Sequence, residues 1–277
     1  MGSQGDVNDA FYLYHSFPRE GDDSQAIQVL KSILEYGLLA TPEILMWMFG
    51  DGETFHVAQK RICFTALKEY ELEEHSKVFG ELSIGVARAD MESIGAVPVF
   101  YVPRALHDER QGRNIGGFHM ERLYQLMVIT HHLQKKDENI PFRNKRIDLQ
   151  DIDAFVRYLT GLFCPIEDVD SDKERFYYAQ KEWRVMGNLF YKGKALSRKL
   201  SKDEVRLFES ISPNFFNTVN EFPTGRYRNI EQSLLIPTIG DEPVRQKIAK
   251  VVTPERLSNE VINILEEFDI SPEVIIL

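Results

Sequence analysis

The segment Gln180-Lys181-Glu182-Trp183-Arg184 holds the side chains of this sequence that are best suited to chemistry. On a strand, residues two apart share a face, so Gln180, Glu182 and Arg184 are expected to point the same way. A Gln-x-Glu pair directed into a cleft can hold a substrate hydroxyl, and the carboxylate stabilises an oxocarbenium-like transition state by Coulomb attraction. The alternative is a solvated strand face on which Glu182 and Arg184 form an ion pair of little energetic worth.

The same segment opens the most basic stretch of the chain. Residues 181–202 hold seven Lys or Arg residues and one acid, although the whole chain has 33 basic and 43 acidic residues and a net charge of −10. A one-signed cluster attracts anions within a Debye length of about 8–10 Å, which predicts a site for a phosphate-bearing ligand. The alternative is a solvated hairpin rim. The acidic total disfavours a nucleic-acid binder, whose affinity rests on neutralising phosphates.

Several classes of protein are excluded by what the sequence lacks. Cys63 and Cys164 are its two cysteines, and their spacing fits neither a disulfide scaffold nor a zinc site. The polar N-terminus MGSQGDVND lacks the pattern of a secretory signal, and no apolar run approaches the 18–20 or so residues that span a bilayer. We therefore expect a cytoplasmic protein that binds neither a metal nor a membrane.

Hydrophobic periodicity predicts the elements that position these residues. Alternating apolar residues indicate strands, whereas helical spacing follows Ser24, a candidate cap, and stops at Gly37. This mixture predicts an α+β fold with a mixed sheet, organised as one domain over residues 1–277 with a helical insertion at about 104–170. The expected strands are 11–15, 61–65, 83–88, 98–102, 176–186, 233–236, 248–252 and 274–277, and the expected helices are 24–36, 69–77, 119–136, 149–163 and 254–268.

A set of short motifs follows in a fixed order along the chain. They are Tyr14-His15-Ser16-Phe17, Ile33-Leu34-Glu35-Tyr36-Gly37-Leu38, Ile62-Cys63-Phe64-Thr65, Phe79-Gly80, Ile84-Gly85, Pro98-Val99-Phe100-Tyr101-Val102 and Glu182-Trp183-Arg184. The first of them resemble the opening of proteins in the ADP-ribosyltransferase superfamily. The whole set is more similar to the AbiGi family of bacterial abortive phage infection systems. The resemblance covers residues 12–102 and 176–186.

The resemblance implies a split, curved sheet of ADP-ribosyltransferase type that grips NAD in catalytic relatives. By this analogy His15 contacts the nicotinamide ribose, Tyr14 lies beside the nicotinamide ring, and Thr65 lines the pocket. Arg184, which begins the basic stretch with Lys181, is the fourth residue expected to bind the anionic nucleotide.

Two functional hypotheses follow from the resemblance. In the first, the chain is an NAD-dependent ADP-ribosyltransferase or NAD glycohydrolase in phage defence, with Glu182 as the catalytic carboxylate and Gln180 placing the acceptor. This hypothesis requires His15 and Glu182 to face the same cleft. In the second, the chain is a non-catalytic antitoxin or regulatory subunit of the same fold, which binds a protein partner from a defence operon.

Overall fold

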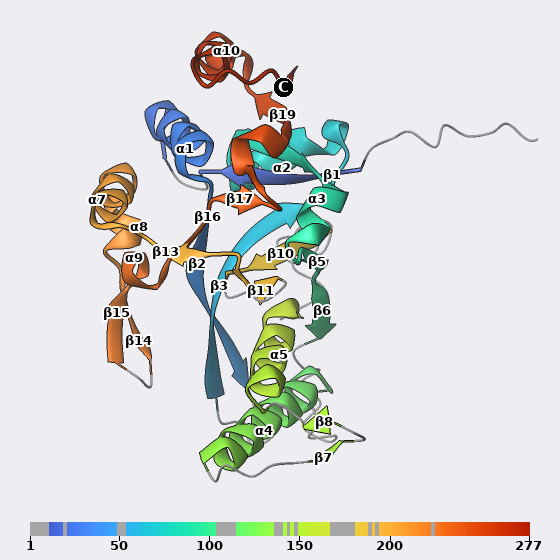
Figure 1. The fold of residues 1–277 in the computed structure, drawn as a ribbon. Coiled ribbons are helices and arrows are strands. Elements are labelled where there is room, and N and C mark those ends of the chain that lie inside the picture. Colours follow the sequence, from blue (N-terminus) through green and yellow to red (C-terminus); the bar gives the residue numbers. More distant parts are fainter. Residues whose placement is uncertain are drawn as a thin grey trace, which may run out of the picture. The chain divides into compact units, whose positions relative to one another are not determined.

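The computed structural model describes residues 11–18, 21–48, 54–103, 115–135, 141–142, 145–146, 149–166, 181–187, 190–191, 194–222 and 225–277. The chain divides into two compact units (Figure 1). The first unit comprises residues 1–43, 60–98 and 180–277, and the second comprises residues 44–59 and 99–179. One domain with a helical insertion stays a prediction.

The largest sheet that the structure describes has ten strands. Its strands are β1 (Tyr12–Phe17), β2 (Leu38–Met48), β3 (Thr54–Thr65), β4 (Leu82–Ala87), β5 (Val97–Pro98), β10 (Glu182–Met186), β13 (Arg198–Lys199), β16 (Leu234–Ile236), β19 (Ile248–Thr253) and β20 (Glu273–Ile276). Their order is β13-β16-β2-β3-β1-β4-β19-β20, and β10 pairs with both β3 and β5. The pair β19–β20 is parallel and its neighbour β4–β19 is antiparallel, so the predicted α+β class with a mixed sheet is confirmed.

Helices and short hairpins of the first unit accompany this sheet. The helical elements are α1 (Asp23–Tyr36), η1 (Glu69–Glu71), α2 (Leu72–Phe79), α3 (Arg88–Ser93), α7 (Lys202–Ile211), α8 (Pro213–Phe216), α9 (Asn229–Gln232), η2 (Val244–Lys247), η3 (Glu255–Leu257) and α10 (Ser258–Glu267). The hairpins are β11 (Phe190–Tyr191) with β12 (Lys194–Ala195), β14 (Val219–Phe222) with β15 (Gly225–Arg228), and β17 (Thr238–Ile239) with β18 (Glu242–Pro243).

Helix α1 shows how local sequence sets an element. The expected cap was Ser24, but Asp22 is the N-cap, and its carboxylate accepts a hydrogen bond of 2.9 Å from the Gln25 amide. A carboxylate is favoured there because it also faces the positive end of the helix dipole. Gly37 ends the helix at φ 108°, as the sequence predicts, and its amide donates to the Ile33 carbonyl.

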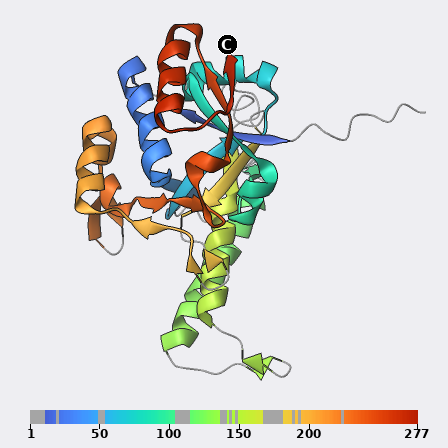
Figure 2. The same ribbon diagram turned by 45° about the horizontal axis from the view of Figure 1, so that its top comes forward.

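One face of the sheet packs against α1 and α10 to form the main core of the first unit. Figures 1 and 2 show these two helices side by side. Alternate strand residues supply the sheet side of this core, as period-two patterning requires. Removing each large aliphatic side chain from water contributes about 1.5–3 kcal/mol. The cluster includes Leu13, Ile62, Phe64, Ile84, Val185 and Val251 from strands, and Leu30, Ile33, Val261 and Ile264 from the two helices.

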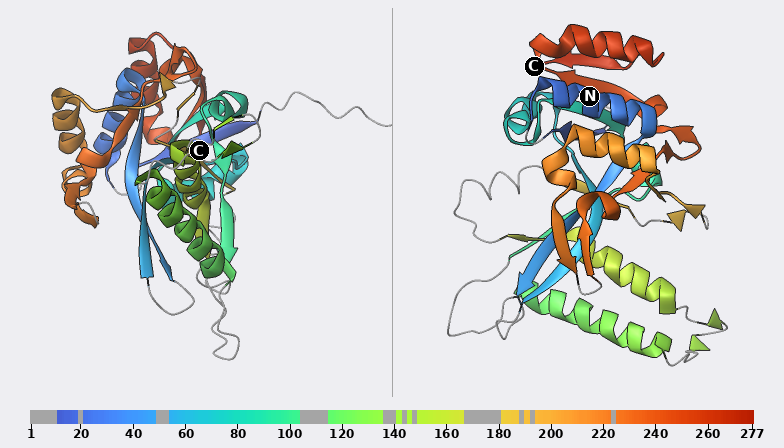
Figure 3. Two further views of the ribbon diagram at one scale, coloured as in Figure 1. Left: turned by 60° about the horizontal axis from the view of Figure 1, so that its bottom comes forward. Right: turned by 90° about the vertical axis from the view of Figure 1, so that its left-hand side faces the viewer.

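The second unit contains two long helices, a parallel strand pair (β6 with β9) and an antiparallel pair (β7 with β8). The helices are α4 (Ile115–Lys135) and α5 (Leu149–Leu162), and the short strands are β6 (Phe100–Pro103), β7 (Pro141–Phe142), β8 (Lys145–Arg146) and β9 (Phe163–Ile166). The helices lie side by side (Figure 3), and the Gln134 side-chain amide Nε2 donates to the Leu149 carbonyl over 2.9 Å. Both helices coincide closely with the predicted spans 119–136 and 149–163.

Candidate functional site

The central strands of the sheet bring three predicted site residues into one row. Glu182 on β10 pairs with Thr65 on β3, and Thr65 pairs with Tyr14 on β1. Directly paired residues in an antiparallel sheet point to the same face, so Tyr14, Thr65 and Glu182 share a face. Arg184 lies two residues beyond Glu182 and shares that face, as the alternation in the sequence predicts.

His15 lies on the opposite face of the sheet. It follows Tyr14 directly in β1, so its side chain leaves the strand in the other direction. Its ring centroid is 5.4 Å from that of Phe64, a residue of the main core, and its Nδ1 donates to the Cys63 carbonyl over 2.9 Å. The structure therefore does not bring His15 and Glu182 to the same cleft, which the transferase hypothesis requires.

Glu182 and Arg184 form a buried, two-pronged ion pair. Arg184 Nε donates to Glu182 Oε1 over 2.8 Å and Nη2 donates to Oε2 over 3.3 Å. The arginine side chain is 1% exposed and the glutamate side chain 10%, so the pair is not the solvated one of the alternative interpretation. Burial raises the pKa of Glu182, but the charge and hydrogen bonds of Arg184 outweigh it and the pKa lies below its ordinary value. Gln180 lies outside the described residues.

A second ion pair and a thiol extend this pair along the same face. Arg61 Nε donates to Glu43 Oε2 over 2.8 Å, and Cys63 lies between Arg61 and Thr65 on β3, paired with Arg184. Burial and the charge of Glu182 raise the pKa of the Cys63 thiol to about 12, so it stays protonated at neutral pH and is a poor nucleophile. We call Glu43, Arg61, Cys63, Glu182 and Arg184 the ionic cluster.

Tyr14 and Thr65 are both buried beside this cluster. The Tyr14 hydroxyl donates to Glu69 Oε1 over 3.2 Å, and its ring packs with Leu72 and Val252. Burial and then the charge of Glu69 hold the pKa of Tyr14 well above its usual value. A phenol held in this way acts as a packed structural residue, and its ring is already covered by neighbouring side chains.

Carboxylates neutralise part of the predicted basic stretch 181–202. Lys181 Nζ lies 3.4 Å from Glu71 Oε2, and Arg198 Nη1 donates to Glu204 Oε2 over 2.8 Å. With Arg184 bound to Glu182, these pairs leave a weaker local field than the count of basic residues in the sequence suggests.

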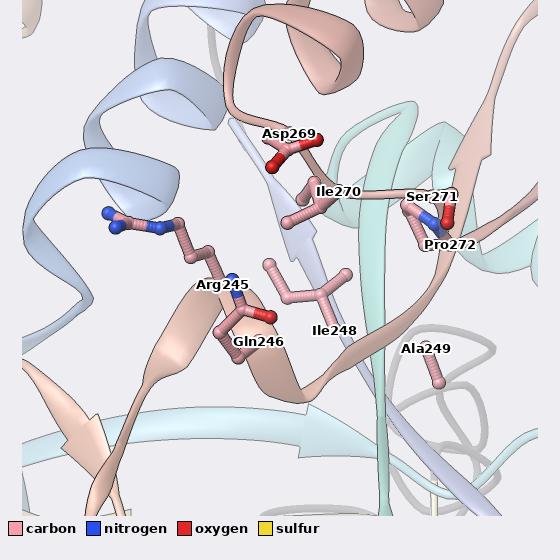
Figure 4. Close-up of a pocket in the computed structure, with 8 residues that line it drawn as sticks. All are labelled: Arg245, Gln246, Ile248, Ala249, Asp269, Ile270, Ser271 and Pro272. Carbon is pink, nitrogen blue, oxygen red and sulfur yellow. The ribbon is translucent and has the colours of Figure 1, made fainter.

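A pocket of about 280 Å³ lies elsewhere in the first unit. Figure 4 shows it between η2 and the loop that follows α10, with the Arg245 side chain reaching toward α1. Arg245 Nη1 donates to the Leu34 carbonyl over 3.4 Å. None of the predicted site residues lines this pocket; its lining residues are Arg245, Gln246, Ile248, Ala249, Asp269, Ile270, Ser271 and Pro272.

Across the described ranges, no three His, Cys, Asp or Glu side chains gather as they do around a metal ion. The helices that the structure describes include none that is both long and apolar enough to cross a membrane. The cytoplasmic location stays a prediction.

Large apolar side chains are exposed on the two long helices of the second unit. This feature was not predicted, although the sequence carries a signal for it in four consecutive apolar residues of α4, Leu126-Met127-Val128-Ile129. Such a run covers most of a helix circumference and cannot all face one core. We call the exposed residues the α4–α5 apolar surface; they are Tyr124, Leu126, Val128 and Ile129 on α4 and Phe155 on α5.

Comparison with known protein families gives one match, over residues 47–217, to the family described as "Putative abortive phage resistance protein AbiGi, antitoxin". The match covers more than half of the chain. The chain belongs to the AbiGi family. The predicted link to abortive phage infection is thereby confirmed. No curated protein and no solved structure gives a significant match, so the ADP-ribosyltransferase type of the sheet stays a prediction.

The AbiGi segment covers some of these features and leaves out others. It includes strands β3 and β10 of the ionic cluster and both helices of the α4–α5 apolar surface. Strand β1, with Tyr14 and His15, lies before the segment, and β20 lies after it. Thr65, the ion pair of Glu182 with Arg184 and the α4–α5 apolar surface therefore all fall within the AbiGi match.

Proposed function

We propose that the chain is a non-catalytic antitoxin of an abortive infection system, which binds a protein toxin and restrains it. The observation that carries the proposal is the α4–α5 apolar surface. Large apolar side chains that stay exposed on helices are typical of protein-binding surfaces, and aromatic anchors such as Tyr124 and Phe155 are enriched there. The surface also falls inside the segment matched by a family described as antitoxin.

The ionic cluster supports this proposal because its Glu182 carboxylate is already bound and is not available to a substrate. Glu182 already accepts two hydrogen bonds from Arg184, and freeing its carboxylate for a ribose would leave the guanidinium buried without its partner. That step is costly because removing one partner of a buried ion pair typically costs about 3–5 kcal/mol. The cluster is therefore best explained as part of the scaffold that holds β10 against β3.

NAD-dependent ADP-ribosyl transfer is the competing hypothesis, and one observation favours it. Tyr14, Thr65 and Glu182 occupy one row on one face of the sheet, so an aromatic ring, a hydroxyl and a carboxylate are aligned. Under this hypothesis NAD would bind on that face, and His15 would take no part. Turnover would depend on Glu182, the one carboxylate of the row.

Two measurements separate these functions. The first expresses the toxin of the same system in bacterial cells, with and without this chain, and follows growth. The proposal predicts that the toxin alone arrests growth, that the chain alone is harmless, and that their co-expression restores growth. The second incubates the purified chain with NAD and measures nicotinamide release, which is predicted to equal that of buffer.

The decisive control is Glu182→Gln, which keeps the shape of the side chain and one oxygen that accepts from Arg184. Thermal unfolding first establishes that the variant folds. Toxicity of the chain alone, together with NAD consumption that Glu182→Gln abolishes, would overturn the antitoxin proposal in favour of the transferase. Failure of the chain to restore growth or to bind the toxin would also refute it.

A further inference from the structure

The edge strands at the two ends of the main path of the ten-stranded sheet, β13 and β20, differ in how they are protected. One edge is β13, which is two residues long, basic and exposed. Short charged strands are a common protection against unwanted strand pairing. The other edge is β20, whose sequence Glu273-Val274-Ile275-Ile276 is apolar after its first residue. Among the described residues, β20 pairs with β19 alone.

The backbone of β20 presents a defined set of groups outward. The Leu277 amide donates to the Thr253 carbonyl of β19, so Leu277 directs its backbone groups inward. In a parallel pair, alternate residues bond the same neighbour, so Glu273 and Ile275 also direct theirs toward β19. Val274 and Ile276 therefore direct their amides and carbonyls away from the sheet. The Ile276 side chain is 54% exposed at the same edge.

From this geometry we infer that β20 binds β20 of a second copy of the chain, in antiparallel orientation about a twofold axis at Ile275. In this register Val274 faces Ile276 of the other copy, and these are the residues with free backbone groups. The two sheets would join into one sheet across the axis. The inference goes beyond the proposed antitoxin function, because β20 lies outside the AbiGi segment and apart from the α4–α5 apolar surface in the sequence.

Charge supports a second copy as the occupant. The one charged side chain of β20 is Glu273, and its carboxylate lies 2.9 Å from Lys250 Nζ in the same chain. Antiparallel pairing places the Glu273 side chain opposite the apolar Leu277 side chain of the other copy, at the ends of the paired strands. The Glu273 side chains of the two copies therefore stay apart. The exposed Ile276 meets Val274 of the other copy, an aliphatic cross-strand pair of the kind that stabilises sheets.

The test is the mass of the full chain in solution, by light scattering or sedimentation over a range of concentrations. The inference predicts twice the 32.1 kDa of one chain for the wild type. Ile276→Pro removes one outward amide without removing a bond to β19, and is expected to weaken the dimer at least about tenfold, which is about 1.4 kcal/mol. Ile276→Val keeps the amide and the β-branched shape, and is expected to stay dimeric.

A cross-link tests the register. Residues at position 275 of the two copies form the pair on the axis, with Cα atoms about 4.5 Å apart, which is within disulfide range. Ile275→Cys is therefore expected to give a covalent dimer under a mild thiol oxidant, at a level well above that of the wild type with its own Cys63 and Cys164. A monomeric wild type, or a dimer unaffected by a folded Ile276→Pro, would overturn the inference. Absence of the cross-link would overturn the register.

Discussion

The ionic cluster of the first unit and the α4–α5 apolar surface of the second reverse the usual distribution of side chains. In the cluster, Arg61 and Arg184 are buried, and each is matched by a carboxylate. On the apolar surface, Ile129 is 53% exposed and Phe155 is 59% exposed. Buried charges that already have partners contribute to architecture, whereas exposed apolar groups gain free energy by finding a partner. The comparison therefore assigns structure to the first region and recognition to the second.

The largest effect is expected when one charge is removed from the ionic cluster. Arg184→Met is expected to destabilise the fold by about 3–5 kcal/mol, because it removes the guanidinium that pairs with the buried Glu182 carboxylate. Urea unfolding followed by circular dichroism measures the change. The double variant Glu182→Leu with Arg184→Leu leaves neither charge and is expected to cost less than Arg184→Met alone. A loss below about 1 kcal/mol for the single variant would show that the pair is dispensable.

A variant on α4 tests whether the α4–α5 apolar surface binds the toxin. Ile129→Glu is expected to weaken binding of the toxin at least about tenfold, because it places a charge within an apolar contact. Its free energy of unfolding is expected to stay within about 0.5 kcal/mol of the wild type, since the side chain is already exposed. Titration calorimetry and urea unfolding measure the two quantities. Val78→Glu, at a valine of α2 that is 44% exposed, is the matched control and is expected to bind normally.

A smaller effect is expected at the start of α7, where Ser201 belongs neither to the ionic cluster nor to the α4–α5 apolar surface. Ser201 Oγ accepts from the Glu204 amide over 3.3 Å, and the Glu204 carboxylate accepts from the Ser201 amide over 2.7 Å. Ser201→Ala removes one half of this capping box and is expected to cost about 1 kcal/mol of stability. Thermal unfolding measures the cost. Ser210→Ala, at an exposed serine within the same helix, is the control and is expected to cost less.

The last prediction concerns pH. Hydrogen bonds from Arg198 lower the pKa of Glu204 to about 2 from an ordinary 4.5. Burial opposes this shift, and hydrogen bonds from Ser201 add to it. A lowered carboxyl pKa stabilises the fold fully above pH 4.5, and this contribution is lost as the pH falls toward 2. Glu204→Gln is therefore expected to flatten the decline of the urea midpoint below pH 4.5. An unchanged slope would show that Glu204 has the same pKa in the folded and unfolded chain.

Most strands and helices were predictable because their patterns are local. The predicted strands at 83–88 and 248–252 correspond closely to β4 and β19, and the last predicted strand, 274–277, corresponds to β20. Strand β2 was missed because Pro42 interrupts its alternation. Helix α7 was missed although Ser201-x-x-Glu204 is a capping-box signature, because its start overlaps the basic stretch 181–202.

The candidate site was less predictable because it depends on register between distant strands. Alternation alone placed Glu182 and Arg184 on one face, and the structure confirms that. Whether His15 joins them depends on which residue of β1 aligns with Thr65, and a shift by one residue reverses the answer. Burial of the ion pair was equally hidden, because exposure is set by tertiary packing rather than by the strand itself.

Growth of cells that express the toxin tests the account most directly when two variants are compared in the same assay. One is Glu182→Gln in the ionic cluster and the other is Ile129→Glu in the α4–α5 apolar surface, each first shown to fold and to accumulate to the level of the wild type. The account predicts that wild type and Glu182→Gln restore growth, whereas Ile129→Glu does not. Restoration by Ile129→Glu together with failure of Glu182→Gln would contradict the assignment of recognition to the apolar surface and of structure to the cluster.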